Sequence, residues 1–172
     1  MFHDEDIKIF SSSKAVQKSD EPYVPMHDSL DGARKLGVAL AGMTKEAERG
    51  FELNINDELL LQRRLLLCFA IATALEDNSK SIQEARTALN TFYDTIKRND
   101  IGFYDDIGSS GHFSFYYLAF RRGGDVERRI GQTFAMLCSH DGDPIYQELG
   151  EALYCWFSSS IEKAINELDL NK

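Results

Sequence analysis

The stretch Asp57–Asp77, DELLLQRRLLLCFAIATALED, decides the fold of this chain. After Asp57 and Glu58, which place negative charge where a helix dipole favours it, apolar residues fill almost every position. The polar exceptions in the first half are Gln62, Arg63 and Arg64. At about 100° per residue, the apolar positions cover nearly the whole circumference of a helix, which is typical of a helix surrounded by neighbours. The stretch therefore predicts a central buried helix.

The composition favours a single helical domain around this stretch. The 172 residues are 43% hydrophobic and 27% charged, which is ordinary for a globular protein with a substantial core. The three prolines are Pro22, Pro25 and Pro144, and few stretches alternate strictly between apolar and polar residues. We therefore expect an all-α fold: a single-domain bundle of five to six helices around residues 57–77. An N-terminal arm would span residues 1–27 and the helical domain residues 28–172.

Charge and hydropathy narrow the partners and the location. The net charge of −9 argues against nucleic acid and against an anionic membrane as partners. Met1–Phe10 is acidic where a secretion signal is basic. The longest apolar span, Leu65–Leu75, is about half of what a bilayer requires. We expect a soluble, acidic, cytoplasmic protein with no nucleic-acid or membrane partner.

The cysteines agree with a reducing compartment. Cys68, Cys138 and Cys155 each lie within an apolar helical pattern, and no Cys-x-x-Cys pair occurs. Their odd number and their settings predict buried free thiols.

Capping signals predict where the first helices begin and end. A helix should begin near Asp28 or Ser29 and run to about Arg49, before Gly50. Its small residues at four-residue spacing predict close approach of another helix backbone; they are Ala33, Gly37 and Ala41. Ser81 with Glu84 forms a capping box that opens the next helix after the central one.

The second half of the chain combines a predicted loop with further helices. Glycines and serines predict a loop over residues 99–111. The aromatic segment His112–Arg122 shows some strand-like alternation, but no partner strand is evident, and we expect a short helix. Asp125 should cap the next helix, and Asp143 with Pro144 the last one. That last helix would run to about Leu168, and its predicted inward face comprises Ile145, Leu149, Leu153 or Ala152, Trp156, Phe157, Ile161, Ile165 and Leu168.

The N-terminal arm holds more apolar groups than a solvated tail requires. They are Phe2, Ile7, Ile9, Phe10, Tyr23 and Val24. We expect part of the arm to lie across the body of the protein or across a partner subunit.

The segment RRGGDVERR, residues 121–129, is the first candidate site. Four arginines flank a glycine pair that opens a helix; they are Arg121, Arg122, Arg128 and Arg129. Helix N-termini attract anions, and guanidinium groups match phosphate or carboxylate geometry. The alternative is structural, because Asp125 caps this helix and the arginines can form surface ion pairs. The glycine spacing matches no nucleotide-binding motif.

The aromatic segment beside it supplies the other candidate ligand-binding residues. Seven aromatic residues occur between Phe103 and Phe120, and their first role is core packing. Tyr116 and Tyr117 are placed to line a pocket or an interface, where tyrosine is favoured. The full candidate set is His112, Tyr116, Tyr117, Arg121, Arg122, Arg128 and Arg129.

Catalytic and metal chemistry find weaker support. The loop at residues 102–112 holds Asp105, Asp106 and His112, and CSHDGDP at residues 138–144 adds His140. Capping and helix-end roles account for these residues, and no further metal-ligand pair at structural spacing occurs. No nucleophile or metalloprotease motif is present. We expect no cofactor and no metal.

Three functions follow as hypotheses. The first is a non-enzymatic protein–protein interaction or regulatory module that self-associates. The second is a module that binds a small molecule or anion through the Arg121–Arg129 segment and the neighbouring tyrosines. The third is an enzyme that uses Asp105, Asp106, His112 and His140, for which the sequence offers no organising motif.

Overall fold

A computed structural model of the chain describes residues 26–49 and 57–170, and within them it contains seven helices and no strand. The helices are α1 (Met26–Arg49), α2 (Asp57–Asn78), α3 (Ile82–Asn99), α4 (Ile101–Ser109), α5 (His112–Arg121), α6 (Val126–Leu137) and α7 (Pro144–Leu170). The all-α prediction is confirmed, whereas the described helices exceed the predicted five to six. Almost all of the predicted arm, and Gly50, lie outside the described residues.

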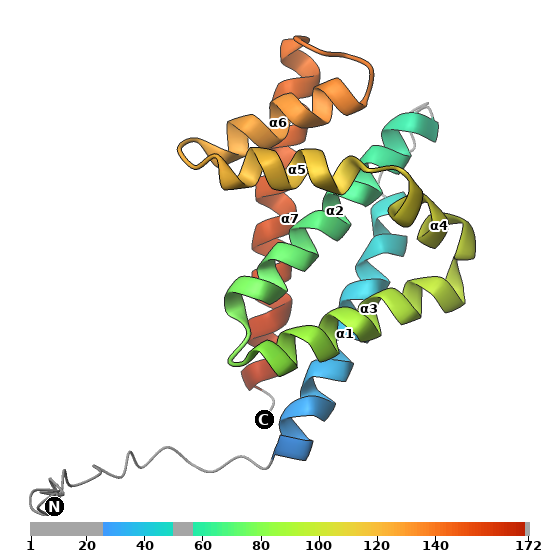
Figure 1. Ribbon diagram of the computed structural model, residues 1–172, viewed down its shortest axis with the longest axis vertical. Helices are drawn as coiled ribbons and strands as arrows, with labels where there is room; N and C mark the ends of the chain where they lie inside the picture. Colours follow the sequence, from blue (N-terminus) through green and yellow to red (C-terminus); the bar gives the residue numbers. More distant parts are fainter. Residues whose placement is uncertain (1–25, 50–56, 171–172) are drawn as a thin grey trace, which may run out of the picture.

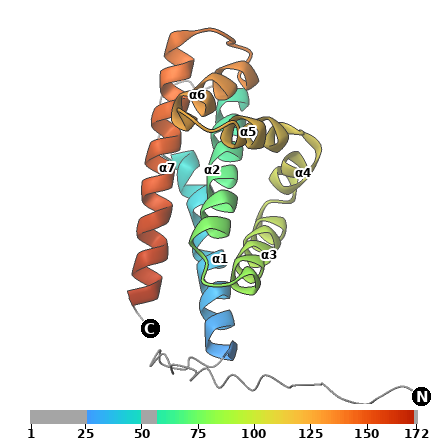
Figure 2. The ribbon, with the colours of Figure 1, turned by 60° about the vertical axis from the view of Figure 1, so that its left-hand side comes forward.

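The predicted central helix is α2, and it runs through the middle of the molecule (Figure 1). It contacts α1, α3, α5, α6 and α7. A second view shows α7 on one side of α2 and α3 with α4 on the other, while α5 and α6 cross one end (Figure 2). More than half of the 22 residues of α2 are buried, because neighbours cover it from several directions. The prediction of a buried central helix is confirmed.

The small-residue strip of α1 is buried, and Gly37 in it lies against α3, so the predicted close approach of another helix is confirmed. Ala33, Gly37 and Ala41 are all buried. A Cβ atom added to Gly37 would lie closer than 3.0 Å to the Ala88 carbonyl oxygen and to the Thr91 Cβ. Only glycine therefore permits the observed distance between the two helices at this point.

Local capping confirms the predicted starts of three helices. The Ser81 hydroxyl accepts a hydrogen bond from the Glu84 amide of α3. Asp125 accepts one from the Arg128 amide of α6, and Asp143 accepts one from the Ile145 amide of α7. Each cap satisfies an amide that has no partner within its own helix.

The loop predicted over residues 99–111 is wrong, because most of it forms α4. Asp100 caps this helix by accepting a hydrogen bond from the Phe103 amide at 3.0 Å. The Phe103 side chain is buried. Its burial and the cap offset the roughly 1 kcal/mol that each of Gly102 and Gly108 costs relative to alanine.

Two residues predicted on the inward face of α7 point outward. Ile145 is 75% exposed and Trp156 is 56% exposed, whereas Leu153, Phe157 and Ile161 are buried. With Gly150, these buried positions follow three- and four-residue spacing and define a narrower stripe than the predicted wide face. The prediction of buried cysteines is also wrong in part. Cys68 and Cys138 are buried, but the Cys155 thiol on the same helix as Trp156 is exposed.

Candidate functional site

The aromatic helix α5 has two faces of different character. Its inner face lies on α2, where Phe69 meets the rings of four α5 residues; they are Phe113, Tyr116, Tyr117 and Phe120. On the opposite side, Phe115 is 47% exposed and Leu118 is 58% exposed. We call the solvent-facing set Ser114, Phe115, Leu118, Arg121 and Arg122 the α5 outer face. The sequence analysis did not predict this face. Helical spacing could have indicated it, because its residues lie on the side of the helix opposite Tyr116 and Ala119.

The candidate arginines gather at the connection between α5 and α6. Arg121 ends α5 and Arg122 is its C-terminal cap. Gly123 and Gly124 have positive φ angles of 65° and 76°, a conformation that glycine adopts without steric cost. The side chains of Arg121, Arg122 and Arg128 are exposed. The structure therefore places three solvated guanidinium groups around one turn.

Arg129 and the N-terminus of α6 both form hydrogen bonds within the chain. The Arg129 guanidinium donates a hydrogen bond to the Gly123 carbonyl oxygen and is only partly exposed. The Asp125 carboxylate accepts from the Arg128 amide at 3.1 Å. A carboxylate thus occupies the position that an anion would take at this helix N-terminus.

The candidate tyrosines differ in burial. Tyr116 is fully buried, with its ring stacked on Phe69 at a centroid distance of 5.3 Å. Tyr117 is partly exposed, and its hydroxyl donates a hydrogen bond to the Glu76 carboxylate. Burial and the negative charge of Glu76 together raise the pKa of Tyr117, and the positive charge of Arg121 opposes this. Tyr117 and Arg121 therefore belong to one neighbourhood, whereas Tyr116 belongs to the core.

His112 lies at the other end of α5 from the arginines. The two ends of this 10-residue helix are about 13 Å apart along its axis. The His112 ring faces α2, where its Nδ1 atom lies 3.2 Å from the Gln62 amide nitrogen. Burial lowers the pKa of His112. The structure brings the arginines and Tyr117 together and does not bring His112 to them.

Buried polar groups also occur at the contact between α2 and α5. Gln62 is buried, and its Oε1 atom has no hydrogen-bond partner among residues 26–49 and 57–170; the same is true of the Tyr116 hydroxyl. Cys138 lies near Tyr116. Burial together with the charge of Glu58 raises the pKa of the Cys138 thiol to about 12. This raised pKa disfavours the thiolate form that nucleophilic chemistry requires.

The segment CSHDGDP forms a structural turn between α6 and α7. The Ser139 hydroxyl donates to the Glu58 carboxylate of α2 at 3.0 Å. The His140 ring stacks on Tyr146 with a centroid distance of 3.7 Å. Within the part of the chain that the structure describes, no group of three His, Cys, Asp or Glu side chains is arranged to hold a metal ion.

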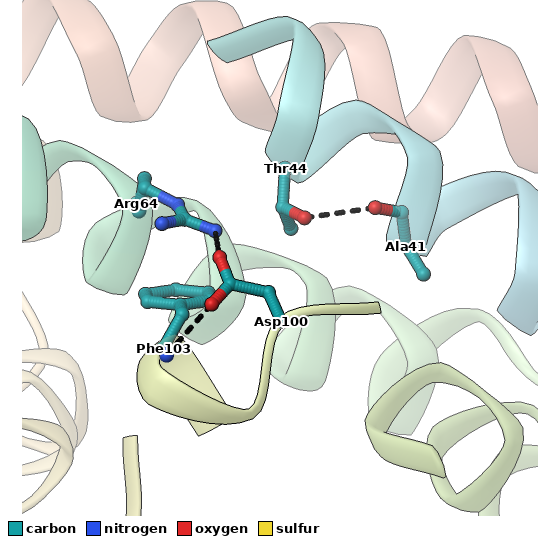
Figure 3. Close-up of polar contacts among 5 residues, drawn as sticks. All are labelled: Ala41, Thr44, Arg64, Asp100 and Phe103. Carbon is teal, nitrogen blue, oxygen red and sulfur yellow. Dashed lines mark hydrogen bonds and ion pairs between the residues drawn. The ribbon is translucent and has the colours of Figure 1, made fainter. Parts of the chain in front are cut away.

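An ion pair joins α2 to α4 (Figure 3). The Arg64 guanidinium donates to the Asp100 carboxylate at 2.8 Å. The same guanidinium lies over the Phe103 ring, 3.6 Å from its centroid. Two hydrogen bonds lower the pKa of Asp100. The bond from Arg64 has the larger effect and the bond from the Phe103 amide the smaller one. These residues fix α4 in place. Asp105 and Asp106, on the same helix, are exposed.

Comparison with known proteins identifies no relative. No protein-family model, curated protein or solved structure matches the chain. Among the described helices, none has both the length and the apolar character needed to cross a bilayer.

Proposed function

We propose that this chain is a non-enzymatic protein–protein interaction or regulatory module. Its contact surface is the α5 outer face together with the exposed Arg128 of the adjoining turn. The observation that carries the proposal is the exposure of Phe115 and Leu118 on a helix whose other side forms core. Two large apolar side chains one turn apart in solvent lose favourable burial, and a partner would supply it.

The α5 outer face combines apolar and basic groups within one helical repeat. Leu118 has Ser114 and Phe115 on one side and Arg121 and Arg122 on the other, at the three- and four-residue spacings that place side chains next to each other. Aromatic residues and arginine are enriched at protein interfaces. A segment that offers apolar side chains flanked by carboxylates fits this arrangement.

The distribution of charge on the chain indicates which charge the partner segment should carry. The chain carries a net charge of −9. In the α5–α6 connection, Arg121, Arg122 and Arg128 are exposed beside the exposed Asp125 and Glu127, and positive charge is in local excess there. Complementary charges increase association rates and select among partners more than they add affinity. The proposed partner segment is therefore acidic and apolar. Self-association through this face would satisfy the same chemistry where a second copy presents an acidic, apolar segment.

The test is the binding of a designed acidic amphipathic peptide, with leucine and phenylalanine at helical spacing and glutamate elsewhere. Its binding is measured by fluorescence anisotropy. Leu118→Asp should weaken binding by roughly tenfold or more, because it buries a charge beside apolar groups. Ile82→Asp is the matched control, because Ile82 is also exposed but lies on α3. Equal binding by the two variants would show that the α5 outer face is not the contact surface.

Self-association is tested separately by size-exclusion chromatography with light scattering. We expect the mass of the unmodified chain to rise with concentration and the Leu118→Asp variant to remain monomeric. A strict monomer at high concentration would remove self-association from the proposal, while the peptide measurement would still test the surface.

The second candidate is an anionic small molecule bound at the α5–α6 connection. The observation that favours it is the gathering of three exposed guanidinium groups, those of Arg121, Arg122 and Arg128. A native site at a ligand concentration of one hundred times its Kd gains about 2.7 kcal/mol of stability. A thermal-shift series with phosphate, pyrophosphate and phosphorylated sugars distinguishes the two. A shift that is lost in Arg121→Ala and Arg122→Ala would support the small-molecule site over the peptide surface.

A further inference from the structure

We propose that residues 1–10 of this chain, MFHDEDIKIF, bind intramolecularly to the α5 outer face. This inference rests on the proposed function and names the first occupant of that surface. The apolar side chains of the segment would cover Phe115 and Leu118, and its carboxylates would meet Arg121 and Arg122. The bound segment would then regulate access of other partners.

The segment has the composition that the surface calls for. Its apolar side chains are Phe2, Ile7, Ile9 and Phe10, and its carboxylates are Asp4, Glu5 and Asp6. The surface presents two large apolar side chains flanked by two arginines. Apolar burial would supply the affinity, and the opposite charges would set the location.

Among the described residues, this face is the best apolar match. Phe115 and Leu118 are the exposed large apolar residues that stand one turn apart on one helix. The other exposed large apolar residues are spread over the surface; they are Val38, Ile82, Ile101, Met136, Ile145 and Trp156. Two of them also lie beside acidic residues at helical spacing, Ile101 with Asp105 and Ile145 with Glu148. An acidic segment would be repelled from those two positions.

The length of chain between the segment and the fold permits intramolecular binding. α1 begins at Met26, at the end of the molecule away from α5 and α6 (Figure 1). Residues 11–25 can span up to about 50 Å when extended. The longest helix, α7, has 27 residues and is therefore about 40 Å long. Residues 1–10 can thus reach the α5 outer face of their own chain.

Intramolecular binding gives the segment an advantage over a separate partner. A short tether holds the segment at an effective concentration in the millimolar range. An external acidic peptide must displace it, so the apparent affinity for that peptide falls. The segment would act as a built-in competitor that a stronger partner removes.

Photo-crosslinking of the full chain tests the placement directly. Phe115 is replaced by p-benzoylphenylalanine, the chain is irradiated at low concentration, and the crosslinked peptide is identified by mass spectrometry. We expect a monomeric product in which position 115 is joined to residues 1–10. The matched control carries the same photoreactive residue at Ile82, where no crosslink to residues 1–10 should form.

A charge-swap series tests the chemistry of recognition. Reversing the acidic run with Asp4→Lys, Glu5→Lys and Asp6→Lys should reduce the crosslink yield roughly tenfold. Adding Arg121→Glu and Arg122→Glu to the reversed chain should restore it, because opposite charges face each other again. Loss without restoration, a crosslink found only between two chains, or no crosslink at all would overturn the inference.

The designed acidic peptide separates this inference from the proposed function. The chain with the reversed acidic run should bind that peptide more tightly than the unmodified chain, because the competitor is weakened. Equal binding by both chains would overturn the intramolecular segment and leave the interaction surface intact. An absence of binding in both chains would overturn the surface itself, and the inference with it.

Discussion

The helices α2 and α5 are both rich in large apolar residues, yet the fold uses them differently. α2 contacts α1, α3, α5, α6 and α7, and more than half of its residues are buried. In α5 only Tyr116 and Ala119 are buried, because α5 lies across the end of the molecule and packs mainly on α2 and α6. Apolar composition therefore predicts a core helix only where neighbours surround it. On the opposite side of α5, Phe115 and Leu118 are exposed.

The largest expected effect compares one phenylalanine from each helix. Phe69→Ala should destabilise the fold by about 3–5 kcal/mol, because it leaves a cavity where four α5 rings converge. Phe115→Ala should change stability by less than about 0.5 kcal/mol, since its ring is half exposed. Urea unfolding monitored by circular dichroism measures both. Similar losses in the two variants would contradict the assignment of Phe115 to a solvent-facing surface.

A smaller effect tests how tightly the helices around α2 are packed. Gly37→Ala should destabilise the fold by about 1–3 kcal/mol, because the added methyl group would overlap the backbone of α3. Gly42 lies on the same helix and has open space around it. Gly42→Ala should therefore stabilise the fold by about 0.5–1 kcal/mol. Thermal unfolding should show shifts of opposite sign. Shifts of the same sign would mean that α1 and α3 do not approach each other as described.

The link between α2 and α4 provides a third test. Asp100→Ala removes a helix cap and the ion pair to Arg64, and should cost about 1–2 kcal/mol. Asp105→Ala, at an exposed position of the same helix, should change stability by less than about 0.5 kcal/mol. Because the folded state lowers the pKa of Asp100, its contribution is complete above about pH 4 and is lost as the pH falls through the folded pKa. Acid unfolding of Asp100→Asn should lack that part of the pH dependence.

Much of the fold was predictable because its determinants are local. The capping side chains are those of Ser81, Asp125 and Asp143. Each accepts a hydrogen bond from a backbone amide two or three residues further along the chain. Apolar residues on every side of the helix predict that α2 is buried. The small-residue strip around Gly37 likewise predicted a close helix contact. These features need no knowledge of which distant residues meet.

The errors arise where distant residues decide the outcome. α4 forms in a glycine-containing segment because Phe103 is buried against distant residues and because Arg64, far away in the sequence, pairs with the capping Asp100. Trp156 is exposed although the sequence predicts it on the inward face of α7. The other helices cover a narrower face of α7 than its apolar pattern indicates. At the candidate site, the arginine cluster was predictable from its spacing. The apolar residues beside it, Phe115 and Leu118, were not, because their exposure depends on which side of α5 faces α2.

The smallest expected effect concerns the histidine at the start of α5. Burial against α2 lowers the pKa of His112 below its usual value near 6.5. The unfolded chain therefore takes up a proton as the pH falls below about 6.5, before the folded chain does, and stability decreases through that range. His112→Asn should flatten this decrease. Urea titrations at several pH values measure the slope, and NMR titration of the His112 ring measures its pKa. A His112 pKa at or above 6.5 would mean that this end of α5 is open to water. The division of α5 into a closed inner face and an available outer face would then fail at its first residue.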